Sequence, residues 1–411
     1  MTGALDESVD SSAPRGQAAS EAPLRIALVT HSFAWENAGG GEVMVRLLAT
    51  ELARAGHDVT VISPDPRGSA ASPVRYHRIE KLSMMSVRRA LRELRPDVVD
   101  VHNMEAVPAA ILAARSLRIP AVVTASSAWT TCLFADMFRP GHGICVTCSV
   151  EGVADCFAHR PAAQIGRRVP AIIGYAETRR RLALVKQAKI VVAHSHASED
   201  LLARNGVHAS RIRVIPNMDE PGFARVHAPE GELVLFVGGL TRNKGADSAV
   251  EAFALLTARR PHARLVMAGE GHLRPELART AAALGVADKV QMPGYVAHDA
   301  IAQLYARAAV VLFPSRAEET FGRIIFEAWN AGAPLVATRI SAPGELVKDG
   351  DTGLLVDPED PKQIADAMAR VLDEPELGAR LAANGRAALA AYAPHMVAPR
   401  YVAAYREAIH A

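Results

Sequence analysis

The segment from residue 310 to residue 338, VVLFPSRAEETFGRIIFEAWNAGAPLVAT, constrains the fold more than any other part of the chain. It begins and ends with apolar runs, Val310–Phe313 and Leu335–Thr338, in which no polar residues alternate with the apolar ones. Such runs are typical of parallel strands that are buried on both faces. Between them the residues predict a polar loop and then a helix that ends at Gly332. We therefore expect a strand, a helix and a second strand, the repeating unit of a parallel sheet.

Two glutamates in this segment indicate a binding site. Glu319 lies in the loop just before the helix, and Glu327 follows eight positions later, about one turn inside it. The start of a helix presents free N–H groups and the positive end of a dipole, which suit a phosphate. One carboxylate at the mouth and one behind it would hold the hydroxyl groups of a polyhydroxylated ligand. The alternative is that Glu319 caps the helix and Glu327 is a surface residue.

The alternation of strands and helices runs through the chain twice. The first series begins with the apolar run at 24–30, and the second restarts at 233–237 after a stretch rich in Pro and Gly. We therefore predict an α/β chain in which two Rossmann-like doubly wound parallel-sheet domains face a central cleft. The predicted divisions are a disordered tail at 1–23, an N-terminal Rossmann-like domain at 24–215 with a Cys-rich insertion at 132–156, a linker at 216–231, a C-terminal Rossmann-like domain at 232–390 and a C-terminal helix at 391–411 that packs back toward the N-terminal domain.

Composition and charge indicate where in the cell the protein is expected. Half of the 411 residues are hydrophobic, yet no uninterrupted apolar stretch approaches the ~20 residues of a transmembrane helix. The first 21 residues lack the basic start and apolar core of a signal peptide, which predicts a cytoplasmic protein. Arginines and lysines gather at Arg88, Arg89, Arg92 and Arg95, and again at Arg167, Arg168, Arg179, Arg180, Arg181 and Lys186.

These basic clusters have two interpretations. They are either solvated helix faces or a surface that docks on an anionic membrane, peripherally at its inner face, to reach a lipid-linked substrate. A nucleic acid is a disfavoured partner, because no aromatic residues are interleaved with these charges.

Two glycine-containing turns at predicted strand ends have features of an anion-binding site. Three glycines at 39–41 precede a predicted helix, so the backbone there would approach a ligand closely. This loop lacks the spaced-glycine fingerprint of dinucleotide-binding folds, which disfavours an oxidoreductase. The turn at 238–245 carries Arg242 and Lys244, two cations that would neutralise a diphosphate as it leaves. The alternative is that both are ordinary surface charges.

The four cysteines of the chain lie within 25 residues of one another. They are Cys132, Cys145, Cys148 and Cys156. The central pair has the spacing of a zinc hairpin, and the outer two would complete a tetrahedral structural site, with His142 and His159 as alternative ligands. Ordinary reduced thiols are an equal alternative, and a cytoplasmic location argues against structural disulfides. A catalytic zinc is disfavoured, since four thiolates leave no open position.

Taken together and in order, short motifs of the chain resemble those of the retaining nucleotide-sugar glycosyltransferases of the GT-B fold, the large family-4 group. The motifs are Gly39-Gly40-Gly41-Glu42, Ala55-Gly56-His57-Asp58-Val59, Pro96-Asp97-Val98-Val99, Ile215-Pro216-Asn217, Phe236-Val237-Gly238, Lys244-Gly245, Ala268-Gly269-Glu270-Gly271, Glu319-x-Phe321-Gly322 with Glu327, and Ala331-Gly332-Ala333-Pro334. The resemblance runs from about residue 24 to the end of the chain, and it implies that the domain at 24–215 is the acceptor side and that the domain at 232–390 binds the donor nucleotide sugar. It implies transfer of a sugar from a nucleoside diphosphate donor, UDP- or GDP-linked, to a glycan or lipid-linked acceptor, without a catalytic metal.

The resemblance also implies roles for individual residues. Glu319 would hold hydroxyls of the donor sugar and act with Lys244 as the catalytic pair, while Glu327 would bind the ribose. The other donor-binding residues would be Phe321, Gly322 and Arg323, whose backbone cradles the diphosphate, together with Gly40, Gly41, Arg242, Gly269 and Tyr295. In such enzymes the acceptor hydroxyl attacks on the face from which the diphosphate leaves, so the main catalytic task is to stabilise the departing charge.

The chain departs from the family pattern at two places near the expected chemistry. Gly239 stands where the family carries an arginine, and Arg242, three residues further on, is the expected substitute. Ser126 stands where the family carries a histidine close to the reacting sugar. These departures favour, as the alternative function, a protein that binds a nucleotide sugar with weak or no transfer.

Overall fold

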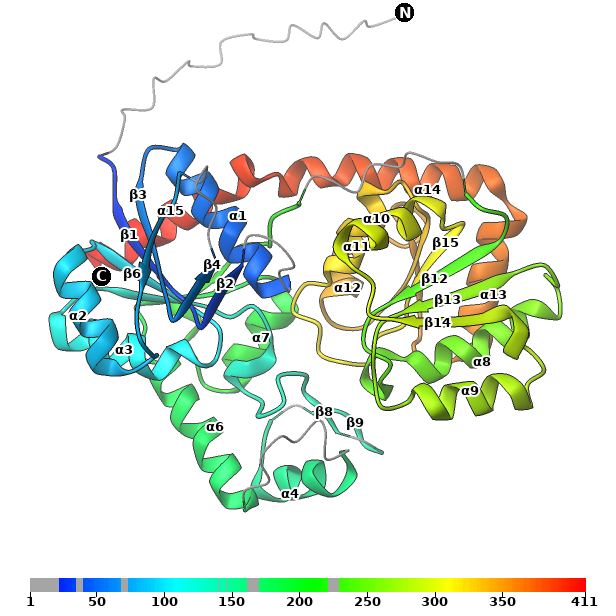
Figure 1. Cartoon of the computed structure of the whole chain (residues 1–411), viewed down its shortest axis with the longest axis horizontal. Helices are drawn as coiled ribbons and strands as arrows, with labels where there is room; N and C mark the ends of the chain where they lie inside the picture. Colours follow the sequence, from blue (N-terminus) through cyan, green and yellow to red (C-terminus); the bar gives the residue numbers. More distant parts are fainter. Residues whose placement is uncertain are drawn as a thin grey trace, which may run out of the picture.

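In the computed structural model both sheets expected from the sequence are present (Figure 1). The predicted tail, except for residues 22 and 23, lies outside the described part of the chain. The residues described are 22–34, 40–67, 73–139, 141–145, 147–160, 170–220 and 229–411.

The N-terminal sheet has seven parallel strands in the order β11-β10-β7-β6-β1-β3-β5. The order reverses beside β1, which pairs with β3 on one side and with β6 on the other. In doubly wound sheets, ligands bind beyond the carboxyl ends of the strands at such a reversal. The strands are β1 Arg25–Val29, β3 Asp58–Ser63, β5 Arg75–Arg78, β6 Val98–His102, β7 Ala121–Thr124, β10 Ile190–Ala193 and β11 Ile212–Val214.

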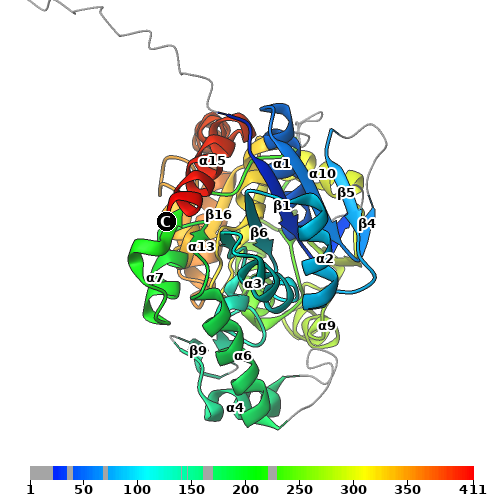
Figure 2. The same ribbon diagram turned by 90° about the vertical axis from the view of Figure 1, so that its left-hand side faces the viewer.

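Helices cover both faces of this sheet, as the continuous apolar strands require. One buried cluster joins the sheet to α2, α3 and α6, and another joins its other face to α1. A short hairpin of β8 (Phe138–Arg139) and β9 (Gly143–Ile144) lies with α4 at the lower edge of the molecule in Figures 1 and 2. The helices are α1 Gly40–Arg54, α2 Met84–Leu94, α3 Ala106–Leu117, α4 Val150–His159, α6 Ala171–Val185 and α7 His196–Arg204.

The C-terminal sheet has six parallel strands in the order β14-β13-β12-β15-β16-β17, which reverses beside β12. The opening segment of the sequence therefore supplies β15 and β16 next to this reversal. The strands are β12 Leu233–Val237, β13 Arg264–Ala268, β14 Val290–Gly294, β15 Val310–Phe313, β16 Leu335–Thr338 and β17 Leu354–Val356. The helices are α8 Ala246–Thr257, α9 Arg274–Ala283, α10 His298–Arg307, α11 Arg323–Asn330, α12 Ser341–Leu346, α13 Pro361–Asp373 and α14 Pro375–Ala388.

The last helix, α15 (Pro394–His410), lies on the N-terminal sheet (Figure 1). Its apolar face, which includes the fully buried Tyr401 and Tyr405, belongs to the same buried cluster as β1 and α1. The Tyr405 hydroxyl donates a hydrogen bond of 2.7 Å to Asp100 of β6, a fully buried carboxylate that also accepts from Thr124. The end of the chain is thus fastened to the centre of the first sheet by apolar burial and by this buried polar contact.

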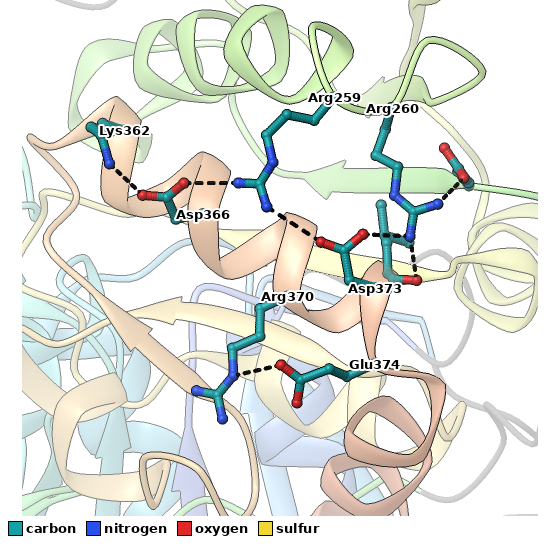
Figure 3. A network of polar contacts seen from close by, with 9 residues as sticks. Arg259, Arg260, Lys362, Asp366, Arg370, Asp373 and Glu374 are labelled. Carbon is teal, nitrogen blue, oxygen red and sulfur yellow. Dashed lines mark hydrogen bonds and ion pairs between the residues drawn. The ribbon is translucent and has the colours of Figure 1, made fainter.

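Charged residues join α8 to α13 on the outside of the C-terminal domain (Figure 3). Arg259 donates to Asp366 at 3.0 Å and to Asp373 at 3.3 Å, and Arg260 donates to Glu232 at 2.9 Å. Exposed ion pairs of this kind each contribute about 0–1 kcal/mol, so the network adds little to stability.

Some helices and strands differ from the sequence prediction. The sequence predicts a helix at about 87–95, but the structure begins α2 three residues earlier, at Met84, because Ser83 caps the helix by accepting from Ser86 N at 3.2 Å. Residues 212–214, which shortly precede the predicted linker at 216–231, form the edge strand β11, which was not among the predicted elements. The strands β5 and β17 have no counterpart among the predicted elements.

Candidate active site

The turn after β12 and the loop after β15 meet at the carboxyl ends of these neighbouring strands, where the strand order reverses. Lys244 lies in the first, which we name the Lys244 turn (238–245), and Glu319 lies in the second, the Glu319 loop (314–322). Lys244 Nζ lies 2.6 Å from Glu319 Oε1. The Ser315 hydroxyl also donates to Glu319 Oε1 at 2.6 Å, so the carboxylate is held from two sides. The structure therefore brings together the two residues predicted to be catalytic.

Glu327 lies one turn inside α11, eight residues after Glu319 in the sequence. The Tyr305 hydroxyl of α10 donates to Glu327 Oε2 at 2.7 Å, and Tyr305 is fully buried. Burial, and then the neighbouring carboxylate, raise the pKa of Tyr305 well above its usual value, so the hydroxyl remains a donor. Sequence reasoning missed Tyr305, because a tyrosine on a helix face looks like any other core residue. Glu327 is only 18% exposed, which does not fit an ordinary surface residue.

Arg323, the first residue of α11, is paired rather than free. Its guanidinium donates to Glu220 at 2.8 Å and lies 3.8 Å from Glu327. Glu220 precedes the part of the predicted linker that is not described, and it is also paired with Arg46 of α1. One linker carboxylate thus joins cations from the two domains, so these domains are connected beside the start of α11.

Two glycines of the site are required by the backbone. Gly322 precedes α11 in the left-handed conformation, with φ +91°, and a Cβ there would lie 3.0 Å from the Phe313 ring. Gly269, at the end of β13, has φ +152°, and a Cβ there would lie 1.9 Å from the Gly238 oxygen. The backbones at the ends of β12 and β13 therefore approach each other more closely than any side chain allows.

The remaining predicted donor residues lie around this centre with different surroundings. Phe321 is buried and stacks on Phe326 with ring centroids 4.8 Å apart. Its side chain therefore belongs to the core, and it is part of the Glu319 loop only through its backbone. Tyr295 is 72% exposed and its N–H donates to Glu270 at 3.1 Å. Gly40 and Gly41 are the first residues of α1, and a Cβ on Gly41 would meet no atom within 4 Å.

Arg242, the expected substitute for the arginine missing at Gly239, points to other partners. Its guanidinium is paired with Asp247 at 3.2 Å and with Glu276 at 2.5 Å. Two carboxylates thus neutralise this cation on the side of α8 and α9. No contact given by the structure joins it to Lys244 or Glu319.

The Glu319 loop also touches the N-terminal domain where the family histidine is expected. The Thr320 hydroxyl donates to the Ser126 main-chain oxygen at 2.9 Å, and the Thr320 oxygen accepts from the Ser195 hydroxyl at 2.9 Å. Ser126 thus lies at the contact between the domains, next to the Glu319 loop, and it occupies the place where the resemblance expects a histidine. Neither Thr320 nor Ser195 carried a sequence signal of its own.

Two of the four cysteines lie together, because Cys145 packs against a small buried cluster of the N-terminal domain that includes Cys132. Among the residues that the structure describes, no three His, Cys, Asp or Glu side chains are grouped so that they could hold a metal ion. Burial, and then the neighbouring thiols, raise the pKa of Cys145 to about 11 and that of Cys148 to about 12. The neighbouring thiols that contribute to these shifts show that the cysteines lie near one another. Structural zinc stays a prediction that metal analysis of wild type and of a Cys145→Ser, Cys148→Ser double variant would decide.

One arginine of the predicted basic clusters, Arg181, does not lie on the surface. Arg181 is 5% exposed and donates to the Trp129 oxygen at 2.8 Å, so it belongs to the interior of the N-terminal domain. The pKa of Arg181 is lowered by burial. Arg89, Arg92 and Arg180 are exposed, whereas residues 167 and 168 lie outside the described residues. No helix in the described residues has the length and apolar character needed to span a membrane.

Two cavities of the C-terminal domain lie away from the Lys244 turn. One, of about 330 Å³, is lined by Leu233 and Arg264, the first residues of β12 and β13. The other, of about 560 Å³, is lined by Pro334 just before β16 and by residues of α14. Both therefore lie toward the amino ends of the strands, opposite to the end where Lys244 and Glu319 meet.

Known families match both halves of the chain. Residues 220–388 match the family described as Glycosyl transferases group 1, and residues 38–218 match Glycosyltransferase Family 4. The chain is 32% identical over 393 residues to a D-inositol 3-phosphate glycosyltransferase of Acidothermus cellulolyticus, covering 87% of this chain and 85% of that protein. It is also 32% identical to the Alpha-D-kanosaminyltransferase of Streptomyces kanamyceticus, over 50% of this chain and 56% of that protein.

Solved structures share the fold over nearly the whole chain. Anabaena HepE in complex with UDP-glucose superposes with a TM-score of 0.68 at 20% identity, covering 92% of this chain and 98% of that chain. Sucrose-phosphate synthase from Thermosynechococcus elongatus gives 0.68 at 22% identity, over 93% and 98% of the two chains. The predicted GT-B fold is thereby confirmed. With the relative that matches most of its length, these findings show that the chain belongs to the family-4, group 1 glycosyltransferases of the GT-B fold.

Proposed function

We propose that the protein transfers a sugar from a nucleoside diphosphate sugar to an acceptor hydroxyl with retention of the anomeric configuration. The observation that carries this proposal is the contact between Lys244 and Glu319 at 2.6 Å, at the carboxyl ends of β12 and β15. A cation and a carboxylate at the reversal of a doubly wound sheet suit a ligand that carries both a diphosphate and hydroxyl groups.

Each residue of the pair has a separate task in this proposal. When the bond between sugar and diphosphate breaks, negative charge grows on the departing oxygen, and Lys244 lies where it would stabilise that charge. Glu319 would accept hydrogen bonds from sugar hydroxyls and orient the sugar toward the acceptor. Before the donor arrives, each neutralises the other, so neither charge is left uncompensated in a half-buried site.

Glu327 and the start of α11 would hold the nucleotide. The Tyr305 hydroxyl fixes one oxygen of Glu327, which leaves the other to accept from the ribose hydroxyls. The backbone N–H groups at Gly322 and Arg323 would receive the diphosphate, as at other helix N-termini. We infer a UDP-linked donor as the first choice, supported by the Anabaena HepE structures that contain UDP and UDP-glucose.

For the acceptor we propose a glycan or a lipid-linked glycan reached at an anionic membrane surface. Arg89 and Arg92 of α2, and Arg95 just after it, are exposed on the N-terminal domain, and Met85 of the same helix is 68% exposed. An apolar side chain beside several cations suits the interface of a negatively charged membrane. Such docking would hold the protein at the inner face of the membrane.

Binding without transfer is the second candidate function. It is favoured by Ser126, which places no imidazole at the contact between the domains, and by Arg242, whose two carboxylate partners hold it away from Lys244. One assay separates the two functions. We expect wild type to release nucleoside diphosphate from a member of a donor panel in the presence of acceptor, and Glu327→Ala to lose most of this activity. The proton NMR coupling of the product's anomeric proton would then report retention.

Turnover by wild type that Glu327→Ala leaves unchanged would contradict the nucleotide site. Donor binding in calorimetry with no release from any donor would establish the binding function instead. Absence of both binding and release would contradict both candidates.

A further inference from the structure

A short segment of the N-terminal domain has a strained backbone around one aspartate. Ala135 and Met137, which flank Asp136, have φ angles of +62° and +48°. Left-handed conformations cost free energy for residues with a Cβ, and they persist only where the surroundings hold them. Met137 is fully buried, so the strain is held by packing on one side of Asp136. Strain of this kind is a reason to ask what Asp136 contacts.

Within its own domain, Asp136 is held by an arginine. The two carboxylate oxygens accept from Arg160 at 3.0 and 2.9 Å, and one of them also accepts from Phe138 N at 3.2 Å. Arg160 itself lies over the Phe134 ring at 4.4 Å from the centroid. The side chains of Asp136 and Arg160 are only 12% and 8% exposed. A bidentate, largely buried pair of this kind fixes the carboxylate in one orientation.

Across the domain boundary, Asp136 reaches both loops of the candidate active site. Asn243 Nδ2 of the Lys244 turn donates to Asp136 Oδ2 at 3.1 Å. The N–H of Glu318 in the Glu319 loop donates to the Asp136 main-chain oxygen, also at 3.1 Å. Each contact is made by the residue immediately before one member of the catalytic pair.

Asn243 extends this connection within the C-terminal domain. Its main-chain oxygen accepts from Arg316 N of the Glu319 loop at 2.8 Å, so Asn243 is bonded to the N-terminal domain by its side chain and to the second loop by its backbone. Lys244, the next residue, then places its ammonium on Glu319. A path of hydrogen bonds therefore runs from Arg160 through Asp136 to Asn243, and the peptide bond from Asn243 to Lys244 connects it to the catalytic pair.

We propose that Asp136 is a positioning residue for the Lys244–Glu319 pair, acting through Asn243 and the Glu318 N–H. This inference rests on the proposed function, since it concerns the geometry of the same site. Reaction rates fall steeply when reacting groups are displaced by about 1 Å, so loosening these loops lowers the rate. The contact joins two domains, so it forms only in the domain arrangement seen here. Glu327 and Tyr305 lie outside this path, so the contact proposed for the ribose does not depend on it.

The test exploits the near-identical shapes of Asn and Asp. Asn243→Asp places a second carboxylate against Asp136 and converts the hydrogen bond into repulsion. We expect its kcat to fall about tenfold, because like charges in contact oppose each other and loosen the loops that carry Lys244 and Glu319. Its Tm should fall as well, because a hydrogen bond to a carboxylate is lost. Adding Asp136→Asn to this variant restores a hydrogen bond with donor and acceptor exchanged. The double variant is expected to recover kcat to that of Asp136→Asn alone, which also serves as the control for the altered Arg160 pair.

Asn384→Ala is the matched control on the surface of the C-terminal domain. Asn384 makes a comparable hydrogen bond, 2.7 Å to Asp351, but in an exposed place away from the site, so this variant is expected to keep the wild-type kcat. Wild-type kcat in Asn243→Asp, or a double variant with no higher kcat than Asn243→Asp, would overturn the proposal while leaving the transferase function intact. Absence of turnover in wild type with every donor would overturn the transferase function, and this inference with it.

Discussion

Replacing Tyr305 by phenylalanine tests whether Glu327 binds the nucleotide part of the donor. The Tyr305 hydroxyl donates a 2.7 Å hydrogen bond to Glu327, and phenylalanine keeps the buried ring while it removes this donor alone. A hydrogen bond to a charged group contributes about 1.5–3 kcal/mol. Part of this loss lowers the free energy of unfolding. The rest weakens donor binding, because the Glu327 carboxylate is less well oriented toward the ribose.

We expect the donor KM of Tyr305→Phe to rise about 5- to 30-fold, which corresponds to a loss of one to two kcal/mol of binding free energy. The kcat should stay within about twofold, because a ribose contact is equally strong in the ground state and in the transition state. Initial rates of nucleoside diphosphate release against donor concentration give both constants. Thermal unfolding of the same variant gives the change in stability.

Tyr405→Phe is the matched control for this experiment. Tyr405 is also fully buried and also donates a 2.7 Å hydrogen bond to a carboxylate, Asp100, but in the N-terminal domain. Both variants should lose about 2–8 °C in Tm, and only Tyr305→Phe should change the donor KM. A lowered Tm with wild-type donor KM in Tyr305→Phe would refute the assignment of Glu327 to the nucleotide.

Three further predictions concern stability and surface binding. Gly269→Ala should lower the free energy of unfolding by about 3 kcal/mol or more in a denaturant titration, because its Cβ would lie 1.9 Å from the Gly238 oxygen; an unchanged midpoint would contradict the backbone contact. Burial lowers the pKa of His194 to about 4, so below pH 6.5 the unfolded chain binds a proton that the native chain does not; stability should fall by about 3 kcal/mol between pH 6.5 and 4, and His194→Gln should remove this part of the fall. The protein should sediment with anionic vesicles at low salt and be released by salt, and replacing Arg89 and Arg92 by alanine should weaken this; equal sedimentation with neutral vesicles would exclude an electrostatic dock.

Much of the sheet architecture could be predicted, because both sheets are parallel and their strands are continuous apolar runs. The bounds of β15 and β16 agree with the predicted runs to the residue. β17 was not predicted, because three residues give too short a pattern to tell a strand from a loop. The edge strand β5, Arg75–Arg78, was not predicted either, since RYHR has no apolar face.

The site was predictable where chemistry follows directly on a strand end. Lys244 and Glu319 belong to loops that follow neighbouring strands, and parallel strands bring such loops to one edge. Tyr305 could not be predicted, since it depends on how α10 packs behind α11. Asp136 could not be predicted either, because its contact with Asn243 joins residues 107 positions apart in different domains. The geometry that links distant segments is set by packing, which no local pattern encodes.

Calorimetric titration of a UDP-sugar into wild type and Lys244→Ala tests the central claim most directly, that the Lys244–Glu319 pair receives the donor. Wild type should bind, and Lys244→Ala should bind about 10- to 100-fold more weakly, because it loses a charge-assisted contact to the diphosphate of about 1.5–3 kcal/mol. Equal affinity of the two proteins would contradict the claim.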